Sequence, residues 1–221
     1  MVVNGIEEGR RHPTAQALVD AAVSQMDDTG EAAIHIKSVL EASGVAYGSL
    51  YHHFKDREDL VCEAIAERYV RSVTLGLPAF ASLAREARTP EQVRALIEAE
   101  MVRLDGEGLR LQRRRRINAI GSAMFRPEVL VRIARQQAAY FDSAAEILAE
   151  VQGRGLIHPT IDVRTFAAWY LSLILSRAFV EIDVAEGACE DWSTYTFVAA
   201  VVLLEQGVDE GHPLSRSTAG G

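Results

Sequence analysis

Helical periodicity runs through almost the whole chain and constrains its fold more than any other feature. Apolar residues return at three- to four-residue spacing, as Leu18, Val19, Ala22 and Met26 do near the N-terminus. This spacing is typical of an amphipathic helix packed on a core. Residues that begin and end helices recur between these segments, so we predict an all-α fold of about nine helices.

The predicted helices are bounded by recognisable start and stop residues. Asp56 and Thr89 are predicted N-caps. Gly44 ends a short apolar stripe, because a residue without a Cβ takes a left-handed turn at little cost. Gly76 and Pro78 are predicted to end the helix that Asp56 opens. The helices are expected near residues 13–29, 36–43, 47–54, 56–73, 89–104, 109–124, 127–152, 162–183 and 191–206.

Composition restricts the class of protein. With 48% hydrophobic and 24% charged residues, the 221-residue chain can bury a sizeable core, so we expect it to be globular. A formal net charge of −8 argues against a protein that coats nucleic acid indiscriminately, because affinity for phosphate comes from clustered Lys and Arg. Any DNA binding must therefore be local.

The sequence holds no pattern that marks an enzyme or a metalloprotein. It has no nucleophile elbow, paired-carboxylate motif, phosphate loop or metal-ligand spacing, so we expect no catalytic residue, no metal site and no cofactor. Cys62 and Cys189 lie far apart, and no basic-then-apolar leader opens the chain, so the cytoplasm is the expected compartment. The apolar stretch 166–180 is shorter than the ~20 residues of a membrane span, so we expect no transmembrane helix.

The most informative segment covers residues 36–55, where two short helices are expected on either side of Gly44. Two helices joined by a glycine turn form the unit that places its second helix in the major groove of DNA. Helical geometry directs Leu50 and Phe54 to one side of that second helix and Ser49 and His52 to the other. The first side is expected to anchor the helix, and the second to contact DNA.

Hydroxyl and imidazole groups on the outer side suit hydrogen bonds to phosphates and base edges. Gly48 allows close backbone approach, and Lys37 and Lys55 flank the unit as expected phosphate contacts. For Tyr51, packing and DNA contact are equally open, whereas packing is the preferred interpretation for His53. The candidate DNA-binding residues are Lys37, Tyr47, Gly48, Ser49, Tyr51, His52 and Lys55.

A resemblance to a known family follows from this segment. The sequence resembles the TetR (tetracycline-repressor-like) family. The resemblance lies in Gly44-Val45, in Gly48-Ser49-Leu50-Tyr51-His52-His53-Phe54-Lys55 and in the following Glu58-Asp59-Leu60. The resemblance covers residues 13–65 and implies repression that a small molecule relieves. It also implies a DNA-binding domain with an N-terminal arm over residues 1–56 and a ligand-binding and dimerisation domain over residues 57–210. Residues 211–221 are expected to form a disordered tail.

Two features depart from the family's usual pattern. His35 stands where Thr or Ser commonly caps the second helix, and Ala46 stands where Ser commonly caps the third. Each cap is therefore expected to be weaker by ~1 kcal/mol. Residues 1–60 contain five Lys or Arg against ten Asp or Glu, so the non-specific affinity for DNA is expected to be modest.

Two groups of arginines have more than one interpretation. Arg10 and Arg11 belong either to a solvated tail or to an arm that orders in the minor groove. The four consecutive arginines at residues 113–116 point around the whole helix, so at most two share a face. A solvated or salt-bridged surface is the preferred interpretation there, ahead of a DNA-binding patch.

The C-terminal half supplies candidates for a ligand pocket, although core packing is the simpler interpretation for each apolar one. Arg177 lies in an apolar helix and needs a partner, which is Glu181 at i+4, a dimer contact or an anionic ligand. The ion pair is preferred. The candidate ligand-binding residues are Met101, Leu104, Ile117, Ile120, Met124, Phe141, Phe166, Trp169, Tyr170 and Arg177.

The last two predicted helices are apolar on nearly every side, and such helices must be covered on more than one side. We therefore expect a homodimer in which these helices form a four-helix interface. The candidate interface residues are Leu173, Tyr195, Phe197, Val201 and Leu204.

Together these patterns predict a dimeric regulator of transcription that binds double-stranded operator DNA. A small, largely apolar effector is expected to release it by shifting the population toward a state with low DNA affinity. The alternative is a small-molecule-binding helical protein with little DNA affinity, which the acidic N-terminal segment makes conceivable. Salt-dependent DNA binding would separate the two hypotheses.

Overall fold

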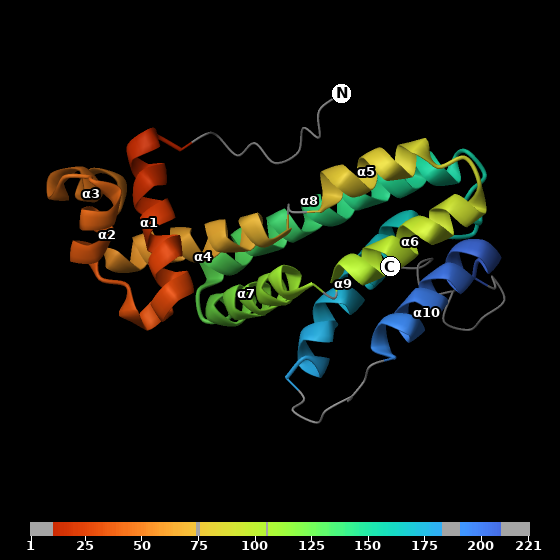
Figure 1. Ribbon diagram of the computed structural model, residues 1–221. Helices are drawn as coiled ribbons and strands as arrows, with labels where there is room; N and C mark the ends of the chain where they lie inside the picture. The colour runs from red at the N-terminus through yellow and green to blue at the C-terminus, as the bar shows by residue number, and fades with distance from the viewer. Residues whose placement is uncertain (1–10, 74–75, 105, 183–190, 209–221) are drawn as a thin grey trace. The chain divides into compact units, whose positions relative to one another are not determined.

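The chain is helical throughout the part that its computed structural model describes, which is residues 11–73, 76–104, 106–182 and 191–208. Within these ranges it forms no strand, so the predicted all-α fold is confirmed (Figure 1). The helices are α1 (Pro13–Thr29), the short 3-10 helix η1 (Glu31–Ala33), α2 (Ile36–Ser43), α3 (Tyr47–His53), α4 (Arg57–Val73), α5 (Leu77–Glu86), α6 (Pro90–Leu104), α7 (Glu107–Ala123), α8 (Pro127–Gln152), α9 (Val163–Val180) and α10 (Trp192–Gln206). The predicted tail at residues 211–221 lies outside the described ranges.

Helix α5 was not predicted from the sequence. Gly76 and Pro78 were interpreted as stop residues for α4, but Gly76 is the N-cap of α5 and Pro78 lies in its first turn. Proline is tolerated there because the first N–H groups of a helix have no partner within the helix. The two residues therefore begin a helix as well as ending one.

Side-chain caps fix several of the other helix starts. The N–H of Asp59 donates to the Asp56 carboxylate over 2.9 Å, so Asp56 caps α4 as predicted. Thr89 accepts from the N–H of Gln92 at the start of α6 over 3.3 Å. Asp162 accepts from the N–H of Thr165 over 2.6 Å, and this bond holds the pKa of the Asp162 carboxyl below its usual range.

By packing, the described residues divide into two compact units. The first contains residues 11–73 and 115–139, and the second contains residues 76–104, 106–114, 140–182 and 191–208. Helices α7 and α8 supply residues to both. The domain boundary predicted after residue 56 stays a prediction.

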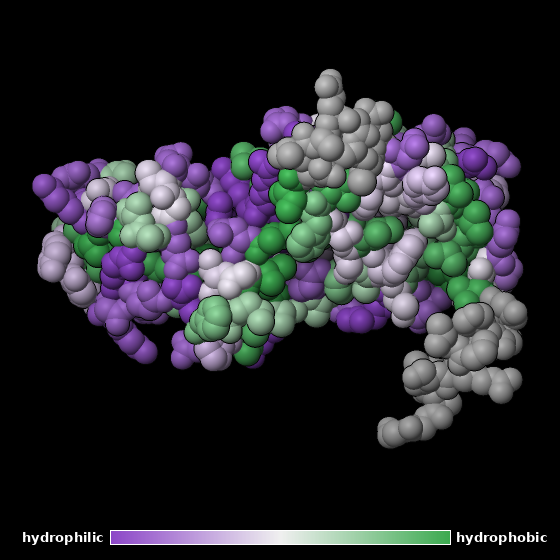
Figure 2. Space-filling model, turned by 90° about the horizontal axis from the view of Figure 1, so that it is seen from below, coloured by the Kyte–Doolittle hydropathy of each residue, from purple (hydrophilic) through white to green (hydrophobic). Residues whose placement is uncertain are grey.

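In the first unit, α1 packs against α4, α2 and α3. Hydrophilic residues are frequent on the surface at the end that α1, α2 and α3 form (Figure 2). Beneath this surface lies an apolar core whose fully buried members include Leu18, Val19, Ile34, Val39, Leu50, Leu60 and Tyr69. A small polar-surfaced unit therefore carries the two short helices of interest.

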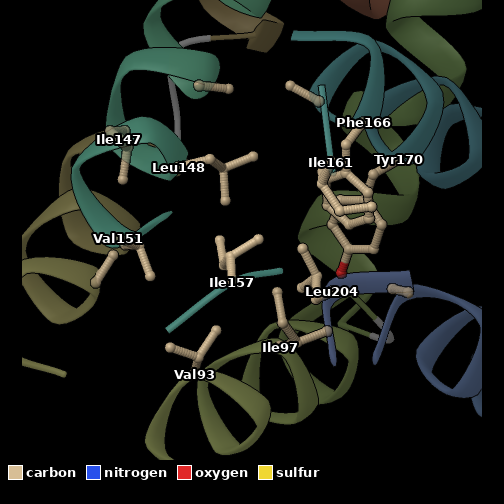
Figure 3. Close-up of a cluster of buried hydrophobic side chains, with 14 of the residues drawn as sticks. Val93, Ile97, Ile147, Leu148, Val151, Ile157, Ile161, Phe166, Tyr170 and Leu204 are labelled. Carbon is tan, nitrogen blue, oxygen red and sulfur yellow. The ribbon is translucent and has the colours of Figure 1, made fainter. Parts of the chain in front are cut away.

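The second unit is built around a larger apolar cluster. Side chains from α6, α8, α9 and α10 point toward one another in it (Figure 3). The labelled members are Val93, Ile97, Ile147, Leu148, Val151, Ile157, Ile161, Phe166, Tyr170 and Leu204. The Phe166 and Tyr170 rings are stacked, with centroids 5.8 Å apart.

The apolar helix α9 is longer than the stretch 166–180 that was considered from the sequence. Over Val163–Val180 its mean hydropathy is 1.2, so by length and composition alone it would be long enough to cross a membrane. Core helices of water-soluble proteins meet the same condition. Phe166, Tyr170 and Ile174 of α9 lie in the apolar cluster of the second unit, as expected of a core helix.

Candidate DNA-binding site

Helices α2 and α3 are joined by a glycine turn. Gly44 takes the left-handed conformation with φ 66°, and its N–H donates to the carbonyl of Leu40. Neither N-cap side chain, His35 nor Ala46, bonds to its helix, which agrees with the expectation of weaker caps. The N–H of His35 is the donor to the Gln25 side chain of α1 over 2.9 Å, which ties the start of α2 to α1.

Helix α3 has an inner and an outer side, as its sequence predicts. Leu50 is 0% exposed and Phe54, its C-cap, is buried as well. On the other side Tyr47 is 63% exposed and His52 is exposed, whereas Ser49 is half-buried. The inner side anchors the helix to the core and leaves the outer side available for DNA.

Gly48 lies on the outer side, and the fold does not require a glycine there. A Cβ built on Gly48 would meet no atom within 4 Å, and its φ is not positive. The absence of a side chain at Gly48 therefore leaves the surface of α3 open and has no role in packing the core. A partner's backbone can approach α3 closely at this point.

Tyr47 and Tyr51 form a pair on the surface of α3. Their hydroxyl oxygens lie 3.3 Å apart and their ring centroids 5.0 Å apart. The pKa of Tyr51 is raised, and the hydrogen bond with Tyr47 is the largest cause. Tyr47 is the donor in this hydrogen bond, so the exposed Tyr51 hydroxyl keeps its own proton available for a phosphate oxygen.

His53 is half-buried and stacks on His12, with ring centroids 5.1 Å apart. This contact confirms the packing interpretation for His53. Burial, followed by the charges of His12 and His52, lowers its pKa. The neutral ring is therefore favoured in the folded protein.

The cations near α3 are few. Lys37 and Lys55 are the only lysines in the sequence, and both are exposed. Lys37 lies 3.9 Å from Glu41 in a fully solvated pair, which is weak. Lys37 lies in the first turn of α2, and Lys55 directly follows the C-cap of α3.

Arginines that were considered as DNA contacts have partners within the protein. Arg11 pairs with Glu63 and Glu67 over 2.8 and 2.5 Å, so it is no free arm, and Arg10 lies outside the described residues. In the run 113–116, Arg115 pairs with Asp27 over 2.9 Å and Arg113 pairs with Glu181. The salt-bridged interpretation of the run is confirmed, but Arg113 is buried rather than on the surface.

Arg57 positions the segment before α2 and was not predicted from the sequence. The Arg57 guanidinium donates to the backbone carbonyls of Ile34 over 2.8 Å and Glu31 over 3.2 Å. It thereby fixes η1 and the segment before α2 against α4. Apolar periodicity carries no signal for a side-chain-to-backbone bond between residues so far apart.

The candidate ligand-binding residues fall into different surroundings. Met101, Leu104, Phe166 and Tyr170 are buried in the cluster of the second unit. Phe141 is half-buried in that unit, and Trp169 is partly exposed on α9. Ile117 and Ile120 are half-buried but belong to the first unit. Met124 is 61% exposed, which does not fit a position that lines a pocket.

Arg177 has the partner that its spacing predicted. Its Nε lies 3.4 Å from the Glu181 carboxylate at i+4. It also donates to the Ser193 hydroxyl over 2.5 Å and lies over the Trp192 ring, 5.4 Å from its centroid. These contacts join the end of α9 to the start of α10.

The predicted dimer residues need a correction. Val201 and Leu204 are buried in the protomer, and Leu204 belongs to the apolar cluster of its second unit. Phe197 packs against that cluster and has the Arg94 guanidinium over its ring. Helix α10 packs closely on α6, so the protomer itself covers these three residues, and a place at a dimer interface does not fit them.

The remaining two dimer candidates lie nearer the surface. Tyr195 is 74% exposed and Leu173 is half-buried. The exposed apolar residues of α10 are Tyr195, Val198 and Val202, and those of α9 are Trp169 and Phe179. These five residues form what we call the outer apolar row of α9 and α10.

Comparisons with known proteins agree with this architecture. Residues 18–64 match the model of the family described as bacterial regulatory proteins, tetR family. That match spans α2, α3 and the turn between them. A comparison with curated protein sequences gave no match.

Solved structures extend the similarity to most of the chain. A putative TetR-family transcriptional regulator from Mesorhizobium loti has a TM-score of 0.62 at 17% identity, covering 88% of this chain and 97% of that one. A second, from Rhodococcus sp., has a TM-score of 0.59 at 21% identity, with coverages of 87% and 99%. A TetR-family regulator from Cytophaga hutchinsonii has a TM-score of 0.60 at 12% identity, with coverages of 92% and 100%.

At these identities the structures establish the shared fold, and the family model establishes the nature of the N-terminal helices. Residues 18–64 therefore match the tetR family of bacterial regulatory proteins, and the chain shares the fold of solved TetR-family transcriptional regulators, with a DNA-binding helix-turn-helix formed by α2 and α3.

Proposed function

We propose that this protein is a dimeric, ligand-responsive repressor that binds operator DNA through α3 and is released by a small, largely apolar effector. The observation that carries the proposal is the outer side of α3. There, exposed Tyr47, Tyr51 and His52 surround Gly48 while Leu50 anchors the helix from within. We assign the DNA contacts to Lys37, Tyr47, Gly48, Ser49, Tyr51, His52 and Lys55, in a cytoplasmic protein.

Dimerisation is supported by the outer apolar row of α9 and α10. Tyr195, Val198 and Val202 recur at helical spacing, so they share one face of α10. A second copy that pairs on this face would cover the row, and an obligate interface buries about 2,000 Å² or more. Two heads would then contact half-sites one helical turn apart on the duplex.

The dimer can be tested by placing charge in the row. We expect a Tyr195→Asp/Val198→Asp double variant to sediment as a monomer at micromolar concentration, because each protomer would bury two unpaired carboxylates at the interface. Leu111→Asp, at an exposed position of α7, is the matched control and should leave the sedimentation unchanged. A wild-type monomer would contradict the dimer.

The chemistry of the effector follows from the second unit. Its interior is aliphatic and aromatic, with the Tyr170 hydroxyl as a polar group beside the Met101 sulfur. An apolar effector that binds there should raise the unfolding temperature and weaken operator binding together. A library of apolar metabolites is screened for compounds that raise the unfolding temperature, and operator affinity is then measured with each of them. Compounds that stabilise the protein but leave its DNA affinity unchanged would count against this coupling.

DNA binding is tested by its dependence on salt. A duplex selected by the wild-type protein from a random pool is titrated at several NaCl concentrations. We expect Lys37→Ala and Lys55→Ala each to weaken binding uniformly and to lower the salt slope by about one. Arg135→Ala, at an exposed position of α8, is the control that should change neither. Unchanged slopes in the lysine variants would remove both from the phosphate contacts.

The alternative is a small-molecule-binding protein with little DNA affinity. The excess of acidic residues within residues 1–60 is the observation that favours it. Failure of the wild-type protein to enrich any duplex would support this alternative.

A further inference from the structure

Three arginines of the first unit reach acidic residues of α1, η1 and α4. Arg115 lies on α7, Arg126 lies between α7 and α8, and Arg132 lies on α8. Their carboxylate partners lie near the end of α1, in η1 and on α4. We call the three arginines the clasp, and α1, η1, α2 and α3 the head.

Arg126 joins three elements. Its Nε lies 2.6 Å from the Glu58 carboxylate at the start of α4, and its terminal nitrogens contact the Glu31 carboxylate of η1 and the Ser122 carbonyl of α7. Glu31 is the first residue of η1, which Arg57 also holds by its backbone carbonyls. Two guanidinium groups thus fix η1 immediately before α2.

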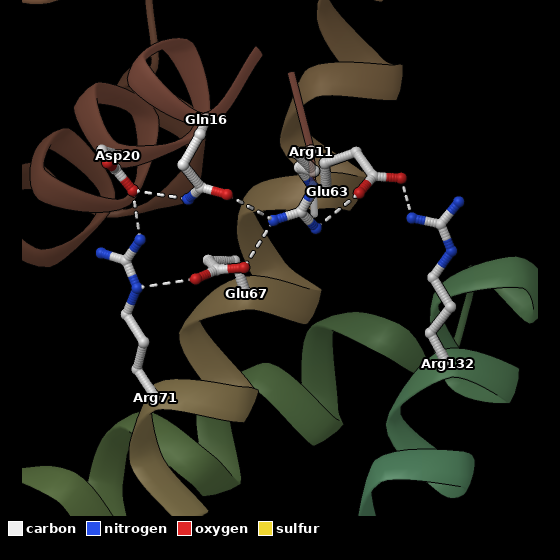
Figure 4. A network of polar contacts seen from close by, with 7 residues as sticks. All are labelled: Arg11, Gln16, Asp20, Glu63, Glu67, Arg71 and Arg132. Carbon is white, nitrogen blue, oxygen red and sulfur yellow. Dashed lines mark hydrogen bonds and ion pairs between the residues drawn. The ribbon is translucent and has the colours of Figure 1, made fainter. Parts of the chain in front are cut away.

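Arg132 and Arg115 contact carboxylates that a second arginine shares. Arg132 pairs with Glu63 of α4, which also pairs with Arg11 over 2.8 Å (Figure 4). Arg115 pairs with Asp27, near the end of α1, and Asp27 also lies 2.6 Å from Arg68 of α4. Each carboxylate therefore binds one arginine of the clasp and one from the N-terminal part of the chain.

These contacts are partly buried, which strengthens them. The side chains of Asp27 and Glu63 are 17% and 14% exposed. Ion pairs that are shielded from solvent are screened less by salt than exposed ones. Together the clasp residues grip the head at the end of α1 and at η1, and they also hold the neighbouring α4.

The clasp accounts for part of the acidic character of the N-terminal segment. A DNA-binding head is expected to be basic, yet residues 1–60 hold ten Asp or Glu. Asp27, Glu31 and Glu58 are three of these, and each bonds to a clasp arginine. These carboxylates therefore serve a contact within the protein.

We propose that Arg115, Arg126 and Arg132 are positioning residues for operator binding: by gripping Asp27, Glu31, Glu58 and Glu63 they hold α2 and α3 in the orientation that fits DNA. The inference rests on the proposed function. Helices α7 and α8, which carry Arg115 and Arg132, also supply residues 107–114 and 140–152 to the second unit.

The first test removes the arginines from the full-length protein. We expect Arg126→Ala and Arg132→Ala each to lower the affinity for the selected duplex about five- to tenfold, and the salt slope to stay unchanged. An arginine that touched phosphate would lower the slope by about one when removed. The amide protons of α2 and α3 should exchange faster in both variants.

The second test removes the carboxylates. Charge repulsion and the clasp predict opposite changes in DNA affinity for these variants. Deleting acidic residues near a DNA site ordinarily raises affinity by reducing repulsion. The clasp predicts that Glu31→Ala/Glu58→Ala instead lowers affinity as Arg126→Ala does, and that combining all three substitutions lowers it no further. Arg126→Lys should restore part of the affinity.

Arg71→Ala is the matched control. Arg71 pairs with Asp20 and Glu67 and so joins α1 to α4 without a clasp residue. It should lower thermal stability without changing the affinity of the folded protein. An equal loss of affinity in Arg71→Ala, or unchanged affinity in the clasp variants, would overturn the proposal.

If the wild-type protein binds no duplex, the proposed function fails. Hydrogen exchange then tests separately whether the clasp holds the head. Faster exchange in α2 and α3 of Arg126→Ala would support the grip on the head. Unchanged exchange would overturn it.

Discussion

The two units of the molecule are stabilised in different ways. Both have an apolar core, but in the first unit a network of arginines and carboxylates also links α1, α4 and α8 (Figure 4). Arg115 of α7 pairs with Asp27 of α1 in addition. The second unit is centred on a broad apolar cluster (Figure 3). Ion pairs can be changed singly without emptying a core, whereas a cluster loses much stability when one large member is removed. The DNA-binding unit is therefore the one whose geometry is more easily adjusted.

The largest expected effect lies in the second unit. Phe166→Ala should lower the free energy of unfolding by about 3–5 kcal/mol, because it removes a buried ring that is stacked on Tyr170. Denaturant unfolding followed by tryptophan fluorescence measures this unit selectively, since Trp169 and Trp192 are the only tryptophans in the sequence. Val102→Ala, at an exposed position of α6, should change the midpoint little.

A smaller effect is expected from Glu63, one of the carboxylates of the first unit that two arginines share. Glu63→Ala leaves Arg11 and Arg132 without this partner and should cost about 1–3 kcal/mol. Hydrogen exchange in α1 and α4 is the measurement, because tryptophan does not report on this unit. Glu41→Ala removes only an exposed pair with Lys37 and is the control. Equal losses of protection in the two variants would mean that a carboxylate paired with two arginines stabilises the unit no more than an exposed pair.

Salt should distinguish the units by a still smaller amount. Raising NaCl from 0.05 to 0.5 M, on the order of the range over which screening becomes strong, should weaken protection in α1 and α4 by about 0.5–1 kcal/mol. The unfolding midpoint of the second unit, followed by fluorescence, should not fall. A parallel loss in both units would contradict the contrast between them.

The smallest expected effect concerns pH and is confined to the first unit. Burial, then His12 and His52, lower the pKa of His53, so the folded state favours its neutral ring. Its contribution to stability is complete above the unfolded pKa of about 6.5 and is lost as pH falls through the lower folded pKa. Protection of α1 and α3 should decline from pH 7 to 5, and less so in His53→Asn. The same decline in both proteins would assign it to other groups.

The contrast between α3 and α10 explains how far the sequence determined the site. In α3, one side is apolar and the other polar, so Leu50 and His52 were assigned to opposite sides correctly. In α10, nearly every position is apolar, so nothing in the pattern fixes the rotation of the helix. Val201 and Leu204 were consequently placed at an interface, although they lie in the protomer's core.

Other features depend on contacts that periodicity does not encode. Gly44 and Asp56 were identified because a left-handed turn and an N-cap each require particular residues. The Arg177–Glu181 pair follows from i+4 spacing. The clasp, by contrast, joins residues that are distant in sequence, as in Arg126 with Glu31, and a charge pattern alone does not pair them.

The central claim is that α3 binds a specific DNA sequence, and a competition experiment tests it most directly. The wild-type protein is used to select duplexes from a random pool, and the affinity for the enriched duplex is compared with that for unrelated duplex at the same salt concentration. We predict a ratio of at least about 10³, reduced by His52→Ala and unaffected by Arg135→Ala. A pool without an enriched sequence, or a ratio near one, would contradict the account.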